Sequence, residues 1–131
     1  MRVGFVCGAF DLLHAGHVHL LRQCKQRCDK LIVGLHVDPS VERKDKNKPV
    51  ETIFERQIKL MGCNWVDNVI VYEKEEDIPL ILNYFNFDVR FLGTDYAKTN
   101  KSITEESLVP IVYIDSMPVT SSSIRQRIKK S

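Results

Sequence analysis

Residues 7–21, CGAFDLLHAGHVHLL, join an apolar run to an apolar-faced helix and place two histidines at the junction. The run itself, residues 2–8 (RVGFVCG), ends in glycine and is typical of a buried strand. Residues 16–28 then carry apolar side chains at helical spacing, and residues 30–37 (KLIVGLHV) form a second buried strand. A strand, a helix and a strand in direct succession predict a right-handed βαβ unit, so the two strands are expected to be parallel.

The same alternation continues along the rest of the chain. Further strands are predicted at 67–72, 87–93 and 108–115, further helices at 50–63, 75–85 and 121–130, and polar loops at 38–49 and 96–107. This order predicts a single α/β domain over residues 1–131, with a Rossmann-like, doubly wound parallel sheet of about five strands in three layers. Ligands of such sheets bind at the carboxyl ends of the strands, here 8–17, 38–49, 93–99 and 115–123.

Composition limits the kind of partner that the chain can have. A formal net charge of +2 on 131 residues is too small to predict nucleic-acid or membrane binding. No signal-peptide pattern and no apolar stretch of membrane-spanning length occurs, so a cytoplasmic location is expected. The four cysteines include no C-x-x-C pair, which favours small buried thiols in a reducing compartment over a zinc site.

The residues of the histidine stretch suit an anion. Gly8 lets a ligand approach the backbone, and the helix that begins near Gly16 offers free N–H groups and the positive end of its dipole. His14 precedes that helix and His17 lies in its first turn, so both could donate hydrogen bonds to phosphate oxygens. A plain helix cap or a buried core histidine is the alternative for either residue. A metal pair is disfavoured because the spacing lacks the i,i+4 pattern and glutamate of a zincin helix. His36, inside a strand, is interpreted as structural.

The stretch GAFDLLHAGHVHLL resembles the G-T-F-D-x-x-H-x-G-H signature of the cytidylyltransferase-like nucleotidyltransferases, whose H-x-G-H core corresponds to residues 14–17. In size and element order the chain is most similar to the small glycerol-3-phosphate cytidylyltransferases, and VTSSSI (119–124) stands where they carry I-S-T-T-x-I. This resemblance implies transfer of CMP from CTP to a small phosphorylated alcohol or polyol, with pyrophosphate released. It also implies Mg²⁺ bound through the triphosphate, and a homodimer.

The resemblance further implies roles for individual residues. Catalysis is expected from His14, His17 and Lys44, with Lys44 gripping the phosphates of both substrates. Acceptor binding is expected from Lys44, Lys46 and Arg56, although Arg56 could instead form a structural ion pair. Nucleotide binding is expected from groups at the strand ends and at the start of the last helix: Gly8, Ala9, Phe10, Asp11, Gly16, Gly93, Asp95, Thr120, Ser121, Ser122 and Ser123.

Three positions depart from the family pattern. Ala9 replaces a threonine, Thr94 replaces an aspartate, and Asp115 stands where the cytidylyltransferases carry an arginine, so Arg125 or Arg127 would have to supply that charge. In addition, NKPVETIFER (47–56) is similar to the adenylyltransferases that activate sugar phosphates in heptose synthesis. An adenylyltransferase that uses ATP on a sugar phosphate is therefore the alternative function, and a non-catalytic nucleotide-binding module is a third.

Overall fold

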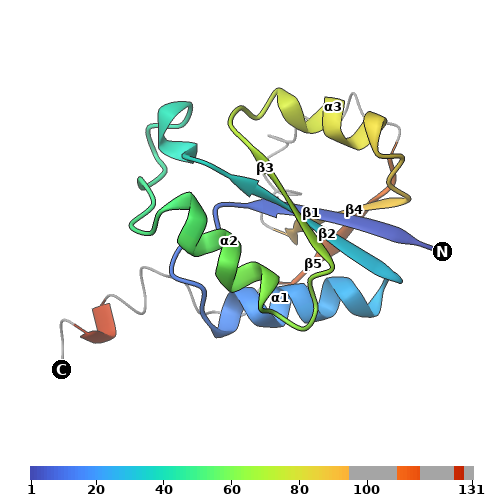
Figure 1. Cartoon of the computed structure of the whole chain (residues 1–131), viewed down its shortest axis with the longest axis horizontal. Coiled ribbons are helices and arrows are strands. Elements are labelled where there is room, and N and C mark those ends of the chain that lie inside the picture. The colour runs from blue at the N-terminus through green and yellow to red at the C-terminus, as the bar shows by residue number, and fades with distance from the viewer. Residues whose placement is uncertain (95–108, 116–125, 129–131) are drawn as a thin grey trace.

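The computed structural model describes residues 1–94, 109–115 and 126–128 of the chain. Within these ranges strands and helices alternate as the sequence predicts (Figure 1). The elements are β1 (Val3–Gly8), α1 (Ala15–Gln26), β2 (Lys30–His36), the 3-10 helix η1 (Pro39–Val41), α2 (Ile53–Met61), β3 (Asn68–Tyr72), α3 (Asp77–Tyr84), β4 (Val89–Gly93) and β5 (Ile111–Ile114). The predicted loop at 96–107 lies outside the described residues, and of the predicted helix at 121–130 only residues 126–128 are described, as helix.

The five strands form one parallel sheet in the order β3-β2-β1-β4-β5. The chain winds outward from β1 to β3 and then returns to β4 on the other side, which confirms the predicted doubly wound α/β fold. Helices α1 and α2 lie on one face of the sheet and α3 lies on the other, so the molecule has three layers (Figure 1). The order reverses between β1 and β4, which is where such sheets bind ligands.

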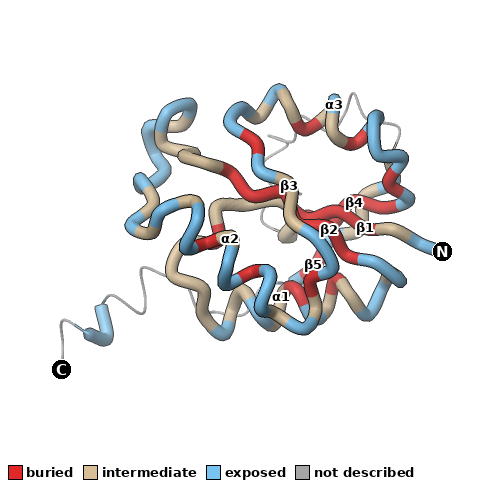
Figure 2. The backbone as a smooth tube through the Cα atoms, viewed as in Figure 1, coloured by how far each residue is buried: buried red, intermediate tan, exposed pale blue. Residues whose placement is uncertain are grey.

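Each face of the sheet carries its own apolar core, because side chains alternate along a strand. On the side of α1 and α2 the core includes Val6, Leu21 and Phe91, and on the side of α3 it includes Phe5 and Leu82. Figure 2 shows that the buried residues concentrate in the strands and on the inner sides of the helices. Full burial of one such side chain contributes about 1.5–3 kcal/mol, so the two cores are the main source of stability.

Helix α2 does not bury its apolar stripe. Phe54, Ile58 and Met61 form an apolar stripe on the outer side of the helix, where all three residues are at least half exposed. Arg56 and Leu60 are buried instead. The reason is that the Arg56 guanidinium hydrogen-bonds to backbone carbonyl oxygens at the ends of β1 and β2, as described below. These hydrogen bonds fix the rotation of the helix.

The helices bear on the expectation that no stretch of membrane-spanning length occurs. Among the described ranges, no helix combines the length and the apolar character needed to cross a bilayer.

The four cysteines are free thiols, and only Cys24 is fully buried. Burial raises the pKa of the Cys24 thiol to about 12, so that side chain acts as a small apolar residue of the core.

Strands β1 and β4 part before they reach the carboxyl edge of the sheet. Their register consists of two pairs, Gly4 with Val89 and Phe5 with Arg90, although β1 continues to Gly8 and β4 continues to Gly93. By contrast, β1 and β2 stay paired over six residues, as far as Gly8 and Leu35. The sheet therefore opens between its central strand β1 and the neighbouring strand β4, and this opening positions the site.

Candidate functional site

His14 and His17 form a capping box at the start of α1. Nδ1 of His14 accepts the backbone N–H of Gly16 at 3.0 Å, and Nδ1 of His17 accepts the backbone N–H of His14 at 3.2 Å. The two rings stack, with centroids 3.9 Å apart. His14 thus takes the N-cap position that Ser, Thr, Asp or Asn usually occupy, and His17 takes the place of the reciprocal Glu or Gln. The cap uses one nitrogen of each ring and leaves the other nitrogen for a ligand.

The capping contacts also fix where each ring carries its proton. A ring nitrogen that accepts an N–H holds no proton, so the neutral rings of His14 and His17 are protonated on Nε2. Burial lowers the pKa of His14. Burial and the neighbouring His14 lower the pKa of His17 to about 4, although Asp11 acts in the opposite direction. Both rings are therefore neutral at pH 7, and each offers one Nε2–H donor of the kind that a phosphate oxygen accepts.

The turn between β1 and α1 is held in a strained backbone conformation. Phe10 and Leu12 have φ angles of 48° and 52°, in the left-handed region that side chains other than glycine rarely adopt. The Phe10 ring is buried, with its centroid 5.4 Å from that of His17. Its side chain is thus part of the core, and only its backbone is available for the nucleotide contact that the sequence predicts.

Carboxylates tie this turn to the segment that leads into α2. Asp11 accepts the backbone N–H groups of Val50 at 2.8 Å and Glu51 at 2.9 Å. In return, the Glu51 carboxylate accepts the backbone N–H of Leu12 at 2.7 Å and pairs with Lys59 at 2.5 Å. Asp11 therefore orders the turn, and residues 50–51 become a wall of the histidine site.

Arg56 is buried beneath the site and crosslinks its backbone segments through hydrogen bonds. Its side chain is 2% exposed, and its guanidinium donates to the carbonyl oxygens of Glu51, Ala9, His36 and Val37 at 2.7–3.2 Å. These bonds join the ends of β1 and β2 to the start of α2. The structure thus places the Arg56 guanidinium against backbone carbonyl oxygens.

A cavity of about 310 Å³ occupies the opening between β1 and β4, and we call it the β1–β4 cavity. It crosses the edge of the sheet, because Leu20 of α1 and Ile78 of α3 both line it. The other lining residues are Val6, Cys7, Gly8, Ala9, His36, Pro39, Arg43, Lys46, Tyr72, Glu75, Arg90, Phe91, Leu92 and Gly93. Of the predicted site residues, Gly8, Ala9, Lys46 and Gly93 line it.

Other predicted residues lie outside the lining. His14 and His17 are half-buried in the turn that follows Ala9, and Gly16 serves the cap rather than the cavity wall. Lys44 is exposed in the loop after η1. Two arginines, Arg43 and Arg90, are among the lining residues that the sequence did not single out as ligand-binding.

The predicted residues Asp95, Thr120, Ser121, Ser122 and Ser123, together with Arg125, lie outside the described residues. Arg127 lies in the short described helical stretch and is exposed. Asp115, the departure from the family arginine, is exposed at the end of β5, where its carbonyl oxygen accepts from the Gln23 side chain at 3.3 Å.

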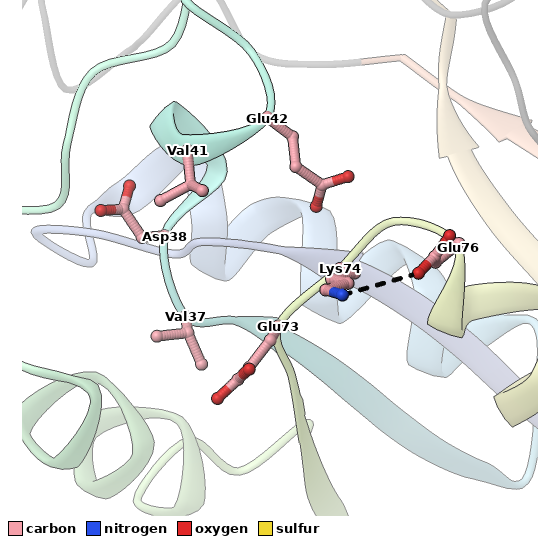
Figure 3. Close-up of a pocket in the computed structure, with 7 residues that line it drawn as sticks. All are labelled: Val37, Asp38, Val41, Glu42, Glu73, Lys74 and Glu76. Atoms are coloured by element: carbon pink, nitrogen blue, oxygen red, sulfur yellow. Dashed lines mark ion pairs between the residues drawn. The ribbon is translucent and has the colours of Figure 1, made fainter.

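Charge favours the β1–β4 cavity as a site for phosphates. Arg43, Lys46 and Arg90 line it against a single carboxylate, Glu75, which pairs with Arg43 at 2.9 Å. A second hollow, of about 360 Å³, lies beyond the ends of β2 and β3 (Figure 3). Four carboxylates and one lysine, Lys74, are among its lining residues, so its negative charge repels phosphate groups.

Across residues 1–94, 109–115 and 126–128, no three His, Cys, Asp or Glu side chains lie close enough to hold an ion. Both oxygens of Asp11 already accept backbone N–H groups. The described residues therefore do not form a cage for Mg²⁺, and binding of Mg²⁺ through a triphosphate stays a prediction from the resemblance.

Comparison with known sequences places the chain in a family. The family model described as cytidylyltransferase-like matches residues 5–127. A stretch of 97 residues, 72% of this chain, is 46% identical to the bifunctional protein HldE of Acidiphilium cryptum. A stretch of 129 residues, 94% of this chain, is 34% identical to the HldE of Rhodopseudomonas palustris. The chain spans 20% and 26% of the length of these two relatives.

Solved structures match the fold as well. The lipopolysaccharide core biosynthesis protein of Thermoplasma volcanium superposes with a TM-score of 0.73 at 27% identity, covering 89% of this chain and 98% of that one. The pantothenate synthetase of Thermus thermophilus superposes with a TM-score of 0.59 over 96% of this chain and 64% of its own. At 12% identity the second match supports the fold alone.

The fold, the histidine cap and these matches together define the class: the chain is an α/β enzyme domain of the nucleotidyltransferase type. More particularly, it belongs to the cytidylyltransferase-like family, as the match over nearly its whole length shows. The predicted family membership and fold class are thereby confirmed.

Proposed function

We propose that this domain is an adenylyltransferase that transfers AMP from ATP to the phosphate of a phosphorylated sugar or a similar small acceptor. The similarity to the HldE proteins and to a lipopolysaccharide core biosynthesis protein supports a sugar phosphate over glycerol 3-phosphate. The resemblance of residues 47–56 to the adenylyltransferases of heptose synthesis supports ATP over CTP.

One structural observation carries this choice: residues 47–56 belong to the site. The backbone N–H groups of Val50 and Glu51 donate hydrogen bonds to the Asp11 carboxylate. The Arg56 guanidinium donates to the carbonyl oxygen of Ala9, just after β1. The segment that is similar to sugar-phosphate adenylyltransferases is therefore part of the wall beside the histidines. A similarity confined to a distant surface would say nothing about the substrate.

The reaction requires positioning more than covalent chemistry from the protein. An oxygen of the acceptor phosphate attacks the α-phosphorus of the nucleotide in line. The new bond joins that oxygen to the α-phosphorus, and the bond from the α-phosphorus to the β-phosphate oxygen breaks. Pyrophosphate leaves with the electron pair of that bond. No proton has to be removed from the nucleophile, because a phosphate oxygen is already anionic at pH 7.

In this reaction His14 and His17 donate their Nε2–H groups to the phosphate oxygens, where negative charge accumulates. Donors fixed in advance by the capping box need no reorganisation, and each is worth roughly 10²–10³ in rate. Mg²⁺, carried in on the triphosphate, would neutralise part of its charge. The exposed Lys44 and the cavity residue Lys46 attract both anionic substrates from solution.

A second candidate is the cytidylyltransferase reaction on glycerol 3-phosphate or a similar polyol phosphate. The match of GAFDLLHAGHVHLL to the family signature and the small size of the chain favour it. Asp115 stands against it, since its carboxylate occupies the position of a cytidylyltransferase arginine.

Pyrophosphate release from a panel of nucleotides and acceptors tests both candidates. Each of ATP, CTP, GTP and UTP is combined with heptose and hexose phosphates, glycerol 3-phosphate, erythritol phosphate, choline phosphate and ethanolamine phosphate. We expect release with ATP and a sugar phosphate, lost on His17→Ala and kept in Arg22→Met, which changes an exposed residue of α1. Turnover with CTP alone would overturn the proposal, and binding of nucleotide without any turnover would favour a non-catalytic module. A homodimer and a cytoplasmic location stay predictions.

A further inference from the structure

Among the described residues, Arg90 is a buried cation that lacks a strong hydrogen-bond acceptor. Its side chain is 5% exposed, and no residue within 1–94, 109–115 or 126–128 accepts a hydrogen bond from Nε or Nη1. Nη2 contacts only the Sγ of Cys7, at 3.6 Å, and a thiol is a weak acceptor. An unpaired buried charge is costly, since the strong hydration of a guanidinium is lost without replacement. Such a group calls for an explanation in terms of a ligand.

The position of Arg90 in the sheet explains where its charge is directed. Arg90 pairs with Phe5 at the last register position before β1 and β4 part. Its neighbours Val89 and Phe91 belong to the core on the side of α1, so Arg90 points to the side of α3. Cys7 and Tyr72 lie on that side too, and with Arg90 they form what we call the floor of the β1–β4 cavity.

The surroundings of Arg90 match the charge of a phosphate group. Arg43 and Lys46 add two cations to the cavity, and the carboxylate of Glu75 is already paired with Arg43. A phosphate monoester, which carries nearly two negative charges at pH 7, would balance the remaining charge. The planar guanidinium can hold two phosphate oxygens at once, which an ammonium group cannot do.

We propose that Arg90 binds the anionic phosphate group of the acceptor substrate at the floor of the β1–β4 cavity. This inference rests on the proposed function, because it assigns the acceptor rather than the nucleotide to that floor. The histidines that are expected to meet the triphosphate cap α1, on one side of the sheet, whereas Arg90 lies on the side of α3. The two anionic substrates would then enter from opposite layers and meet where the sheet opens.

The test compares the wild-type protein with the variant Arg90→Met, which largely keeps the length of the side chain and removes its charge. Arg22→Met is the matched control, because it removes the same charge from an exposed position. Affinities for inorganic phosphate, glucose 1-phosphate and ATP are measured by calorimetry on the full chain. We expect Arg90→Met to weaken binding of both phosphate probes at least tenfold and to leave ATP affinity within twofold. Arg22→Met should change none of the three.

Two results would overturn the proposal. One is that Arg90→Met binds both phosphate probes as tightly as the wild type. The other is that ATP affinity falls while the phosphate probes are unaffected, which would assign Arg90 to the nucleotide. These measurements need no turnover, so they stand apart from the proposed function, which fails separately if no nucleotide and acceptor pair yields pyrophosphate.

Unfolding measurements separate a ligand-binding arginine from a structural one. If Arg90 is reserved for a ligand, Arg90→Met should raise the melting temperature of the ligand-free protein, because it removes an uncompensated charge. A lower melting temperature with unchanged phosphate affinity would show a structural role instead. Should Arg90→Met not fold, Arg90→Lys and the wild type still decide the matter. Phosphate must then shift the Arg90 Nε–H resonance of the wild type, assigned by its loss in Arg90→Lys, and an unmoved resonance would refute the proposal.

Discussion

Nδ1 of His17 accepts the backbone N–H of His14, while the ring of His14 caps the helix that carries His17. Each ring therefore holds the backbone with one nitrogen and leaves the other nitrogen for a ligand. Since the helix cap depends on Nδ1 and the proposed phosphate binding depends on Nε2, substitutions can separate the two.

His14→Asn is expected to keep the fold and lose the activity. Asparagine is among the best N-cap residues, so the free energy of unfolding should change by less than about 0.5 kcal/mol. The rate of pyrophosphate release should fall roughly 10²–10³-fold, because the Nε2–H donor is lost. His14→Ala should lose the activity and also about 1 kcal/mol of stability. Thermal unfolding and pyrophosphate assays measure both effects, and full activity of His14→Asn would show that the ring only caps the helix.

Acid should destabilise the domain through His17. Its pKa in the folded protein, about 4, lies below its ordinary value of 6.5, so the unfolded chain takes up the proton first as the pH falls. This contribution to the free energy of unfolding is fully present above pH 6.5. It is lost as the pH drops toward 4, by up to roughly 3 kcal/mol. Urea unfolding at a series of pH values measures the slope. His17→Asn should flatten it, and an equal slope in that variant would rule out His17 as its source.

Arg56→Lys should unfold the domain more easily although it keeps the charge. A lysine cannot reach the carbonyl oxygens of Ala9, His36 and Val37 together, so several buried acceptors lose their donor. A loss of about 2–4 kcal/mol is expected by urea denaturation. Arg22→Lys, on the exposed side of α1, serves as the control and should be neutral. If Arg56→Lys were as stable as the wild type but bound phosphate poorly, Arg56 would be a ligand-binding residue after all.

Lys46 should matter more than Lys44 for acceptor binding. Both are exposed in the same loop, but only Lys46 lines the β1–β4 cavity. We expect Lys46→Ala to raise the KM for the phosphorylated acceptor several-fold more than Lys44→Ala does, and added salt should reduce the difference. The reverse order would favour the role that the family resemblance implies for Lys44.

The sequence predicted much of the fold because apolar periodicity and glycine positions are local signals. The strand that ends at Gly8 and the helix that follows it were placed within one or two residues. The histidine pair was singled out because two such residues at the start of a helix suit an anion. What the pattern did not reveal is that both rings take part in the capping box through Nδ1, since that depends on the rotation of each ring.

Local pattern carried no information where tertiary contacts decide which residues are buried. Phe54 and Ile58 gave α2 its apolar stripe, yet the four carbonyl oxygens around Arg56 decide which face is buried. The sequence did not indicate that Arg90 is buried, because the guanidinium of an arginine in a short strand normally reaches solvent. The hydrophobic residues on both sides of Arg90, in a strand that lies inside the sheet, were the one available hint.

The parting of β1 from β4 also affects how the backbone meets water. Amides in the middle of a parallel sheet are ordinarily the slowest in a domain to exchange with deuterium, since the sheet opens only when the domain unfolds. Here β1 and β4 are no longer paired beyond Phe5 and Arg90. Amide groups that face the gap should therefore exchange as fast as those of a loop. Substrates that fill the gap should slow this exchange, which would report occupancy of each half of the site without any chemical step.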